Sequence, residues 1–358
     1  MTEIQATAVP EATAVPEAAA PRATRGVTGA FADGLRTVAG ATWLVAGLWL
    51  ATVLLALPLA LTLRGMLAAH LGDSLAAAEA ARGVNFDWWN EFLAQAAGIG
   101  QTFVPAIIGF AAVLKNLSGV ADAEGLPTVI VSAVAAHLVL STFLLGGTLD
   151  RLARGHRVGV AGFFAACGTF FFRFLRLAVV AGAAYWALFA WVHPLLFDTV
   201  YGAWTRNVSM ERTAFVYRVA LYAAFGALLL VVNLVVDYAK IRAVVEDRRS
   251  MLGALVAGAR FAWRNAWACL GLYLADMLLF VALLLAYAVV APGAGGGIGF
   301  WIGFAVSQTY LVLRVVVRLQ FAASQIALFQ DRLAHAGYTA APVPTWPDSP
   351  AAEAIRPA

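Results

Sequence analysis

Charged residues are scarce in this sequence: they make up 12% of its 358 residues, whereas hydrophobic residues make up 62%. Because soluble globular domains carry about 25% charged residues, this composition excludes an ordinary soluble domain. Several apolar runs approach the roughly 20 residues that cross a hydrocarbon core of about 30 Å. The sequence therefore predicts an all-α, polytopic membrane protein. Its basic residues lie at the ends of the predicted spans rather than on one soluble face, so no nucleic-acid partner is expected.

Cysteine is also rare, and Cys167 and Cys269 supply neither a disulfide framework nor a metal-binding pattern. The sequence contains no nucleophile elbow, Walker loop, dinucleotide fingerprint or zinc motif. Four histidines are scattered without the spacing of metal ligands: His70, His156, His193 and His335. We therefore expect no catalytic residue, no metal and no cofactor, and a lipid-processing enzyme is the least favoured function class.

Ala/Pro-rich segments flank the hydrophobic part of the chain. Residues 1–28, which contain TAVPEA twice in tandem, and residues 334–358 are predicted to be disordered cytoplasmic tails, because neither can bury enough apolar surface. Residues 1–28 also lack the features of a signal peptide. Residues 29–333 form the predicted membrane domain. Its six predicted spans are Trp43–Leu63, Thr128–Leu149, a segment that begins at Val160 and crosses to Val192, Val219–Val236, Ala268–Val290 and Phe300–Gln320.

The longest predicted connection, residues 64–127, is an acidic outer loop with three basic residues against six acidic ones. Trp88 and Trp89 have the character of an interfacial aromatic anchor. Within the loop, Gly100–Leu114 is apolar but contains Pro105 and is too short for an ordinary span. We expect it to re-enter the membrane or lie on its surface, with a seventh span as the alternative.

The basic residues of the short connections predict the orientation. Arg151, Arg154 and Arg157 follow the second span, and another basic cluster follows the fourth, whereas the loop after the fifth span has no basic residue. The loop after the third span fits less well, because it carries Arg206, Arg212 and Arg218, which Asp198 and Glu211 offset in part. The whole distribution predicts a multi-pass protein of a bacterial-type inner (plasma) membrane with both termini in the cytoplasm.

Internal similarity predicts three hairpin repeats, each led by an amphipathic helix at the interface. The predicted lead-in helices are Phe31–Thr42, Val160–Arg173 and Met251–Arg264. Gly162, Phe170 and Arg173 recur at one constant offset as Gly253, Phe261 and Arg264, and each hairpin ends in an Asp-Arg pair: Asp150-Arg151, Asp247-Arg248 and Asp331-Arg332. Since every repeat begins and ends on the same side, the repeats are expected to be parallel.

The run DYAKIRAVVEDRRSMLGALVAGARF, residues 237–261, resembles a segment of a family of uncharacterised bacterial six-helix membrane proteins. That family is similar to the membrane domain that precedes some glycerophosphodiester phosphodiesterases. The matching features are an Asp at the end of a span, a basic and acidic surface segment, and an amphipathic helix that leads into the next span. The resemblance implies a fold and not a reaction, because no soluble phosphodiesterase domain accompanies it here.

Ionisable residues inside the predicted spans are costly, at about 2.5 to 3.5 kcal/mol for one charge at a helix centre. Asp276 and Arg314 are equidistant from Gly295 in the last predicted turn, which predicts that they pair across the hairpin. The same reasoning pairs Arg173 with Asp237. These pairs are interpreted as structural ion pairs, with proton or ion coupling as the alternative.

Three further polar residues lie near these pairs. Asn233 lies one turn from Asp237, and Arg318 follows Arg314 by one turn, where its side chain is expected to reach the interface. His137, midway through the second span, is interpreted as a hydrogen-bonded packing residue, with a proton relay as the alternative.

The favoured function is that of a non-catalytic membrane or complex-assembly protein that contacts anionic lipids. Arg36, Arg260 and Arg264, beside aromatic residues of the lead-in helices, are the candidates for binding lipid head groups. The alternative is a small-solute transporter or permease that uses Asp276 and Arg314 inside the membrane. Membrane lipids are the expected partners, with other membrane protein subunits as a second class.

Overall fold

The computed structural model describes residues 26–72, 74–80, 83, 85–104, 117–125, 128–154, 159–291 and 298–334. Six helices among them are long and apolar enough to cross a membrane, which confirms the predicted all-α polytopic bundle. These are α2 (Thr42–Leu71), α6 (Thr128–Arg154), α7 (Val160–Ala187) with its continuation to Thr205, α9 (Glu211–Val245), α11 (Ala266–Val290) and α12 (Ile298–Ala334). The predicted tails lie almost entirely outside the described residues.

Two shorter helices, α1 (Val27–Ala39) and α10 (Met251–Arg264), precede α2 and α11. They correspond to the first and third predicted lead-in helices. The second predicted lead-in helix, Val160–Arg173, is not separate, because α7 continues through it into the span without interruption.

Most of the membrane helices are longer than the sequence predicted. The third continues beyond Val192 through two π-helical segments, η2 (Leu188–Val192) and η3 (Leu195–Val200), into α8 (Tyr201–Thr205). The predicted span ended at Val192, whereas the helix continues through Pro194, a residue that usually disrupts a helix interior. On both sides of Pro194 the backbone hydrogen bonds have the π-helical pattern, so each amide donates to the carbonyl five residues earlier instead of four. Such local changes of hydrogen bonding let a helix continue past a residue that disrupts the α-helical pattern.

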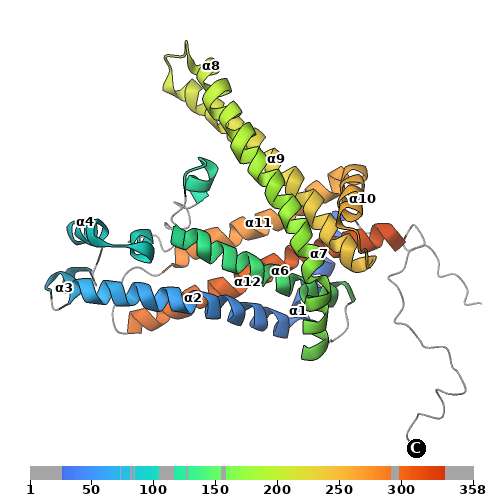
Figure 1. The fold of residues 1–358 in the computed structure, drawn as a ribbon, viewed down its shortest axis with the longest axis horizontal. Coiled ribbons are helices and arrows are strands. Elements are labelled where there is room, and N and C mark those ends of the chain that lie inside the picture. Colours follow the sequence, from blue (N-terminus) through green and yellow to red (C-terminus); the bar gives the residue numbers. More distant parts are fainter. Residues whose placement is uncertain are drawn as a thin grey trace, which may run out of the picture.

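One end of the molecule is closely packed, and we call it the base. There α1 packs against α12, the start of α7 against the end of α6, and α10 against the end of α9 (Figure 1). Three glycines allow these approaches: a Cβ at Gly34 would lie 2.8 Å from a backbone nitrogen of α12, one at Gly258 2.8 Å from a backbone nitrogen of α9, and one at Gly147 2.7 Å from a backbone oxygen of α7. These contacts suit a threefold repeat, and the repeat relationship itself stays a prediction.

The Asp-Arg pairs used to align the repeats do not occupy equivalent positions. Asp150 lies inside α6 and pairs with Arg154 at 2.7 Å. Asp247 lies beyond the end of α9 with a φ of 45°, in the left-handed region that a short polar side chain tolerates. The similarity between these two sites is therefore one of sequence and not of local conformation.

The α7–α9 hairpin leaves the base at a wide angle to the other four spans (Figure 1). We call residues 186–230 of this hairpin the arm, α2, α6, α11 and α12 the bundle, and the region where they separate the fork. No residue of α9 between 226 and 235, and none of α6 before Gly146, is buried. Packing between the hairpin and the bundle is thus concentrated at the base.

The outer loop contains α3 (Ala76–Ala80), α4 (Phe86–Gln95) and a short 3₁₀ helix, η1 (Gly98–Thr102). Trp88 stacks on Phe92 and donates to His70 Nδ1 at 3.0 Å. Of the predicted re-entrant segment Gly100–Leu114, residues 105–114 lie outside the described residues. A later part of the loop, residues 117–125, contacts the arm: His193 Nε2 lies 2.9 Å from the Ala121 carbonyl oxygen, and Arg218 pairs with Asp122 at 3.2 Å.

Candidate functional site

A cavity of about 840 Å³ lies at the fork, and residues from all six long helices line it. Its volume falls within the range of roughly 300–1,000 Å³ that is usual for small-ligand sites. The helices α6, α7, α9 and α12 supply most of the wall, whereas α2 contributes Thr52 and α11 contributes Phe280. The cavity therefore depends on the way that the α7–α9 hairpin meets the bundle.

Four of the six polar intramembrane residues that the sequence singled out line this cavity: His137, Asn233, Asp237 and Arg314. The other two, Arg173 and Asp276, do not. The cavity also contains Lys240, Arg318 and Gln325, to which the sequence analysis gave no role inside the membrane. The spacing of one helical turn between Arg314 and Arg318 indicates that both side chains lie on one face of the helix. The prediction for Arg318 was instead that its side chain reaches the membrane interface.

The predicted Asp276–Arg314 pair is wrong. Asp276 is fully buried and accepts a hydrogen bond of 2.6 Å from the Ser324 hydroxyl. Ser324 lies ten residues beyond Arg314, which is about 15 Å along a helix axis. The contact between Asp276 and Ser324 is symmetric about residue 300 rather than about the predicted Gly295. Residues opposite one another on α11 and α12 are consequently shifted from the predicted register.

The predicted Arg173–Asp237 pair is also wrong. Arg173 donates to Asp247 at 2.7 Å and lies over the ring of Phe170, whereas Asp237 pairs with Lys240 at 2.9 Å on its own helix. The start of α7 packs at the base, so Arg173 reaches the residues that follow α9 rather than its interior.

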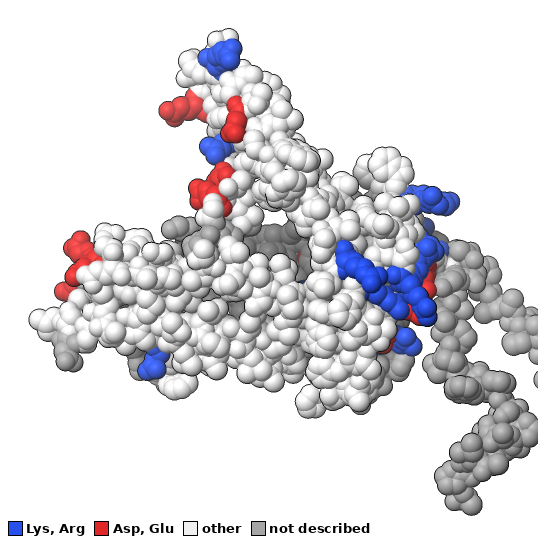
Figure 2. Space-filling model, viewed as in Figure 1, with Lys and Arg blue, Asp and Glu red and all other residues white. Residues whose placement is uncertain are grey.

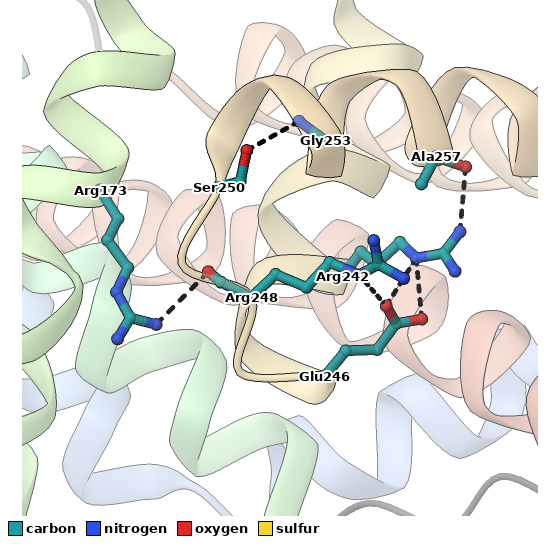
Figure 3. Close-up of polar contacts among 7 residues, drawn as sticks. All are labelled: Arg173, Arg242, Glu246, Arg248, Ser250, Gly253 and Ala257. Atoms are coloured by element: carbon teal, nitrogen blue, oxygen red, sulfur yellow. Dashed lines mark hydrogen bonds and ion pairs between the residues drawn. The ribbon is translucent and has the colours of Figure 1, made fainter.

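The junction between α9 and α10 is held by charged contacts around Glu246 (Figure 3). Arg242 pairs with Glu246 at 2.8 Å and donates to the Ala257 carbonyl oxygen of α10 at 3.1 Å. Arg248 also contacts Glu246, and Arg173 donates to the Arg248 carbonyl oxygen at 3.4 Å. These contacts fix the lower end of α9, which carries Asp237 and Lys240 into the cavity wall.

The cavity has more positive than negative charge. Its lining contains the cations Lys240, Arg314 and Arg318 but one carboxylate, Asp237, which is already paired with Lys240. Within the described part of the chain, Arg314 and Arg318 make no ion pair or hydrogen bond, and both side chains are exposed. Like charges four residues apart on a helix repel each other. Asp237 is the carboxylate of the lining that acts on Arg318, and it is shared with Lys240, so the described lining keeps a net positive charge.

Neutral hydrogen-bonding groups surround this pair. Asn233 accepts from the Tyr185 hydroxyl at 3.5 Å and donates to the Tyr273 hydroxyl at 3.1 Å. Gln325 is only 3% exposed, and its Nε2 has no hydrogen-bond partner among the described residues. An amide nitrogen is a hydrogen-bond donor. Gln325 therefore adds a donor without a partner among the described residues to the cavity wall that also contains Arg314 and Arg318.

This chemistry is suited to an anion. A guanidinium presents planar, paired donors that match the oxygens of a carboxylate or phosphate, and such charge-assisted hydrogen bonds are among the stronger ones. Groups of three or more potential metal ligands do not occur in the described residues. We find no basis there for assigning a metal or cofactor to particular side chains.

The predicted lipid-binding arginines lie outside the cavity. Arg36 is exposed on α1 and pairs with Asp33 at 2.9 Å. Arg260 and Arg264 are exposed on α10, close to Trp263 and Trp267, which are 85% and 88% exposed. On the face shown in Figure 2, Lys and Arg side chains gather at the base.

Comparison of the chain with family models, curated proteins and solved structures gives no match. The resemblance of residues 237–261 to six-helix bacterial membrane proteins therefore stays a prediction.

Proposed function

We propose that this integral membrane protein is non-catalytic and binds an anionic ligand in the cavity at the fork. The observation that carries the proposal is the pair of guanidinium groups, Arg314 and Arg318, which line the cavity without an ion pair to any described residue and outnumber its one carboxylate. An anion between them would offset their mutual repulsion.

The proposal is tested by ligand-induced stabilisation of purified protein. The probes are inorganic phosphate, sulfate, succinate and an anionic phospholipid, each compared with a neutral phospholipid. A ligand at 100 times its Kd stabilises the folded state by about 2.7 kcal/mol. We expect at least one anionic probe to raise the unfolding temperature of the native protein, and that shift to disappear in Arg314→Gln/Arg318→Gln.

The matched control is Arg206→Gln/Arg212→Gln, which removes the same charge from exposed positions of the arm. It should keep the ligand-induced shift. An equal shift in the cavity variant and the native protein, or no shift with any probe, would refute ligand binding at the arginine pair.

We further infer that the base faces the cytoplasm of a bacterial-type inner membrane, with both termini on that side. The support is the basic character of the base, where the positive-inside tendency would place it. Reporter fusions after residues 157 and 249 should report cytoplasm, and a fusion after residue 205 should report the opposite side. The same signal at all three positions would overturn this orientation.

Anionic lipid contact at the base is part of the proposal. The exposed face of α10 combines Leu252, Val256, Arg260 and Trp263, which is the character of a helix lying at an interface. Arg260→Glu/Arg264→Glu should reduce co-purified anionic lipid without loss of the folded protein. Unchanged lipid content would remove this contact from the proposal.

Transport is the second candidate, because a cavity lined by all six long helices could move its ligand as well as hold it. The two functions differ in a flux assay with protein-containing liposomes. Flux of a bound anion that Arg314→Gln/Arg318→Gln abolishes would favour a transporter, whereas binding without flux would favour a binding protein.

A further inference from the structure

We propose that the ligand of the cavity is an anionic phospholipid, with its phosphate on the arginine pair and an acyl chain leaving through the fork. This inference rests on the proposed function, since it names the ligand of the same site. It differs from lipid contact at the base, because it places one head group between the α7–α9 hairpin and the bundle.

The first support is the amphiphilic character of the wall. Arg314, Arg318 and Gln325 lie at i, i+4 and i+11 on α12, so they form one polar stripe along its axis. Much of the remaining wall is apolar and includes Leu138, Phe174, Ala178, Ala181, Phe280, Leu311 and Phe321. A small hydrated anion would bind to the polar stripe and leave the apolar wall in contact with water. A phospholipid would contact the polar stripe with its head group and the apolar wall with its acyl chain.

The second support is the depth of the arginine pair. If α12 enters the hydrocarbon core at Ile298, Arg314 lies about 24 Å along the helix and Arg318 about 30 Å along it. A hydrocarbon core is about 30 Å thick. The pair therefore lies at the base-side edge of the core, which is the level of phosphate groups in the leaflet on that side.

The third support is that the fork gives an acyl chain a route. Above the base, no residue of α6 before Gly146 and none of α9 between 226 and 235 is buried, and the exposed apolar side chain of Leu138 lines the cavity. In a bilayer these surfaces need hydrocarbon cover. A chain that starts at Arg314 and runs towards the middle of the bilayer would supply it from inside the fork (Figure 1).

A variant that narrows only the apolar part of the cavity distinguishes between a lipid and a small anion as the ligand. Gly182 lines the cavity, and a Cβ built there meets no atom within 4 Å. Gly182→Leu should therefore fold and occupy space that an acyl chain needs, without touching the charge of the arginine pair. Gly226→Leu is the matched control, since Gly226 also has free space and does not line the cavity.

The experiment titrates the full-length protein in mild detergent with phosphatidylglycerol, phosphatidylcholine or inorganic phosphate and counts bound molecules by native mass spectrometry. We expect one phosphatidylglycerol on the native protein and on Gly226→Leu, with at least tenfold weaker binding to Arg314→Gln/Arg318→Gln and to Gly182→Leu. Phosphatidylcholine should bind more weakly than phosphatidylglycerol, because it has no net negative charge.

The outcomes distinguish the two proposals. Binding of inorganic phosphate to the native protein and to Gly182→Leu, without specific phosphatidylglycerol binding, would overturn the lipid assignment and leave the anion site standing. Equal phosphatidylglycerol binding by the native protein and both cavity variants would also overturn the assignment. Failure of every anionic probe to bind would overturn the proposed function itself.

Discussion

The base and the fork are built from the same two hairpin helices, α7 and α9, yet they differ in packing. At the base, glycines allow α1, α7 and α10 to approach neighbouring backbones closely, and most buried residues lie there. At the fork, the same helices separate and enclose a cavity with unpaired cations. Resistance to unfolding is expected where contacts are dense, and ligand sites favour the less stable parts of a fold. The comparison assigns stability to the base and ligand binding to the fork.

The largest effect is expected from breaking the base. Gly258→Val places a side chain against the backbone of α9, where even a Cβ would lie 2.8 Å from the Ala239 nitrogen. Because backbone cannot rotate away as a side chain can, we expect a loss at the upper end of the roughly 1–3 kcal/mol usual for overpacking. Thermal unfolding in detergent measures it.

Gly226→Ala, on the part of α9 that leaves the base, is the control for that substitution. It has no atom within 4 Å of its Cβ position, and Ala is favoured over Gly in a helix by about 1 kcal/mol. It should leave stability unchanged or raise it. Comparable destabilisation by both substitutions would contradict the contrast between base and fork.

An intermediate effect is expected at Asp276, which lies beside Ser324 on the closely packed side of α12. Ser324→Ala removes the hydroxyl that donates to the buried carboxyl group and leaves the side chain of Gln320 as its donor, so we expect a loss at the lower end of the about 1–3 kcal/mol for an unsatisfied buried group. Asp276→Ala should cost less, because the Ser324 hydroxyl can still donate to the Phe321 carbonyl oxygen at 3.2 Å. The unfolding free energies of both variants measure this asymmetry. A larger loss for Asp276→Ala would point to a stranded cation and restore a role for Arg314.

The smallest effect is expected where residues 117–125 contact the arm. The Tyr222 hydroxyl donates to Asp122, and Arg218 lies 3.2 Å away, so the pKa of Asp122 is held below its ordinary value of 3.8. Because the pKa of Asp122 is lowered in the folded protein, the ionised carboxylate contributes its full stabilisation above the ordinary pKa. That stabilisation is lost as the pH falls through the lowered pKa. Between about pH 5 and 8 it should therefore not change.

Hydrogen exchange of residues 117–125 tests that expectation. Asp122→Asn should speed exchange there with little change in the unfolding temperature, because the contact is exposed. Ser118→Ala, which removes a weaker neighbour of Asp122 at 3.4 Å, is the control and should have less effect. A marked change between about pH 5 and 8 in the protection factor, which is the observed exchange rate corrected for the intrinsic rate at each pH, would assign the contact to a group other than Asp122.

The sequence by itself determined the membrane class, the six long helices and the polar residues that would be found among them. Apolar runs and their lengths suffice for this, because each helix satisfies its own backbone hydrogen bonds in the membrane. The sequence also indicated that His137, Asn233, Asp237 and Arg314 were unusual. It could not show that they line one cavity.

Tertiary structure decided the partners of the charged residues. Pairing across a hairpin depends on helix register and on the direction of each side chain, and in the folded protein Asp276 lies opposite Ser324 rather than Arg314. Likewise, the packing of α7 at the base brings Arg173 into an ion pair with Asp247, whereas Asp237 pairs with Lys240. The absence of an ion pair to Arg314 and Arg318 among the described residues follows from these partners, because it depends on where six helices meet and not on any local sequence pattern.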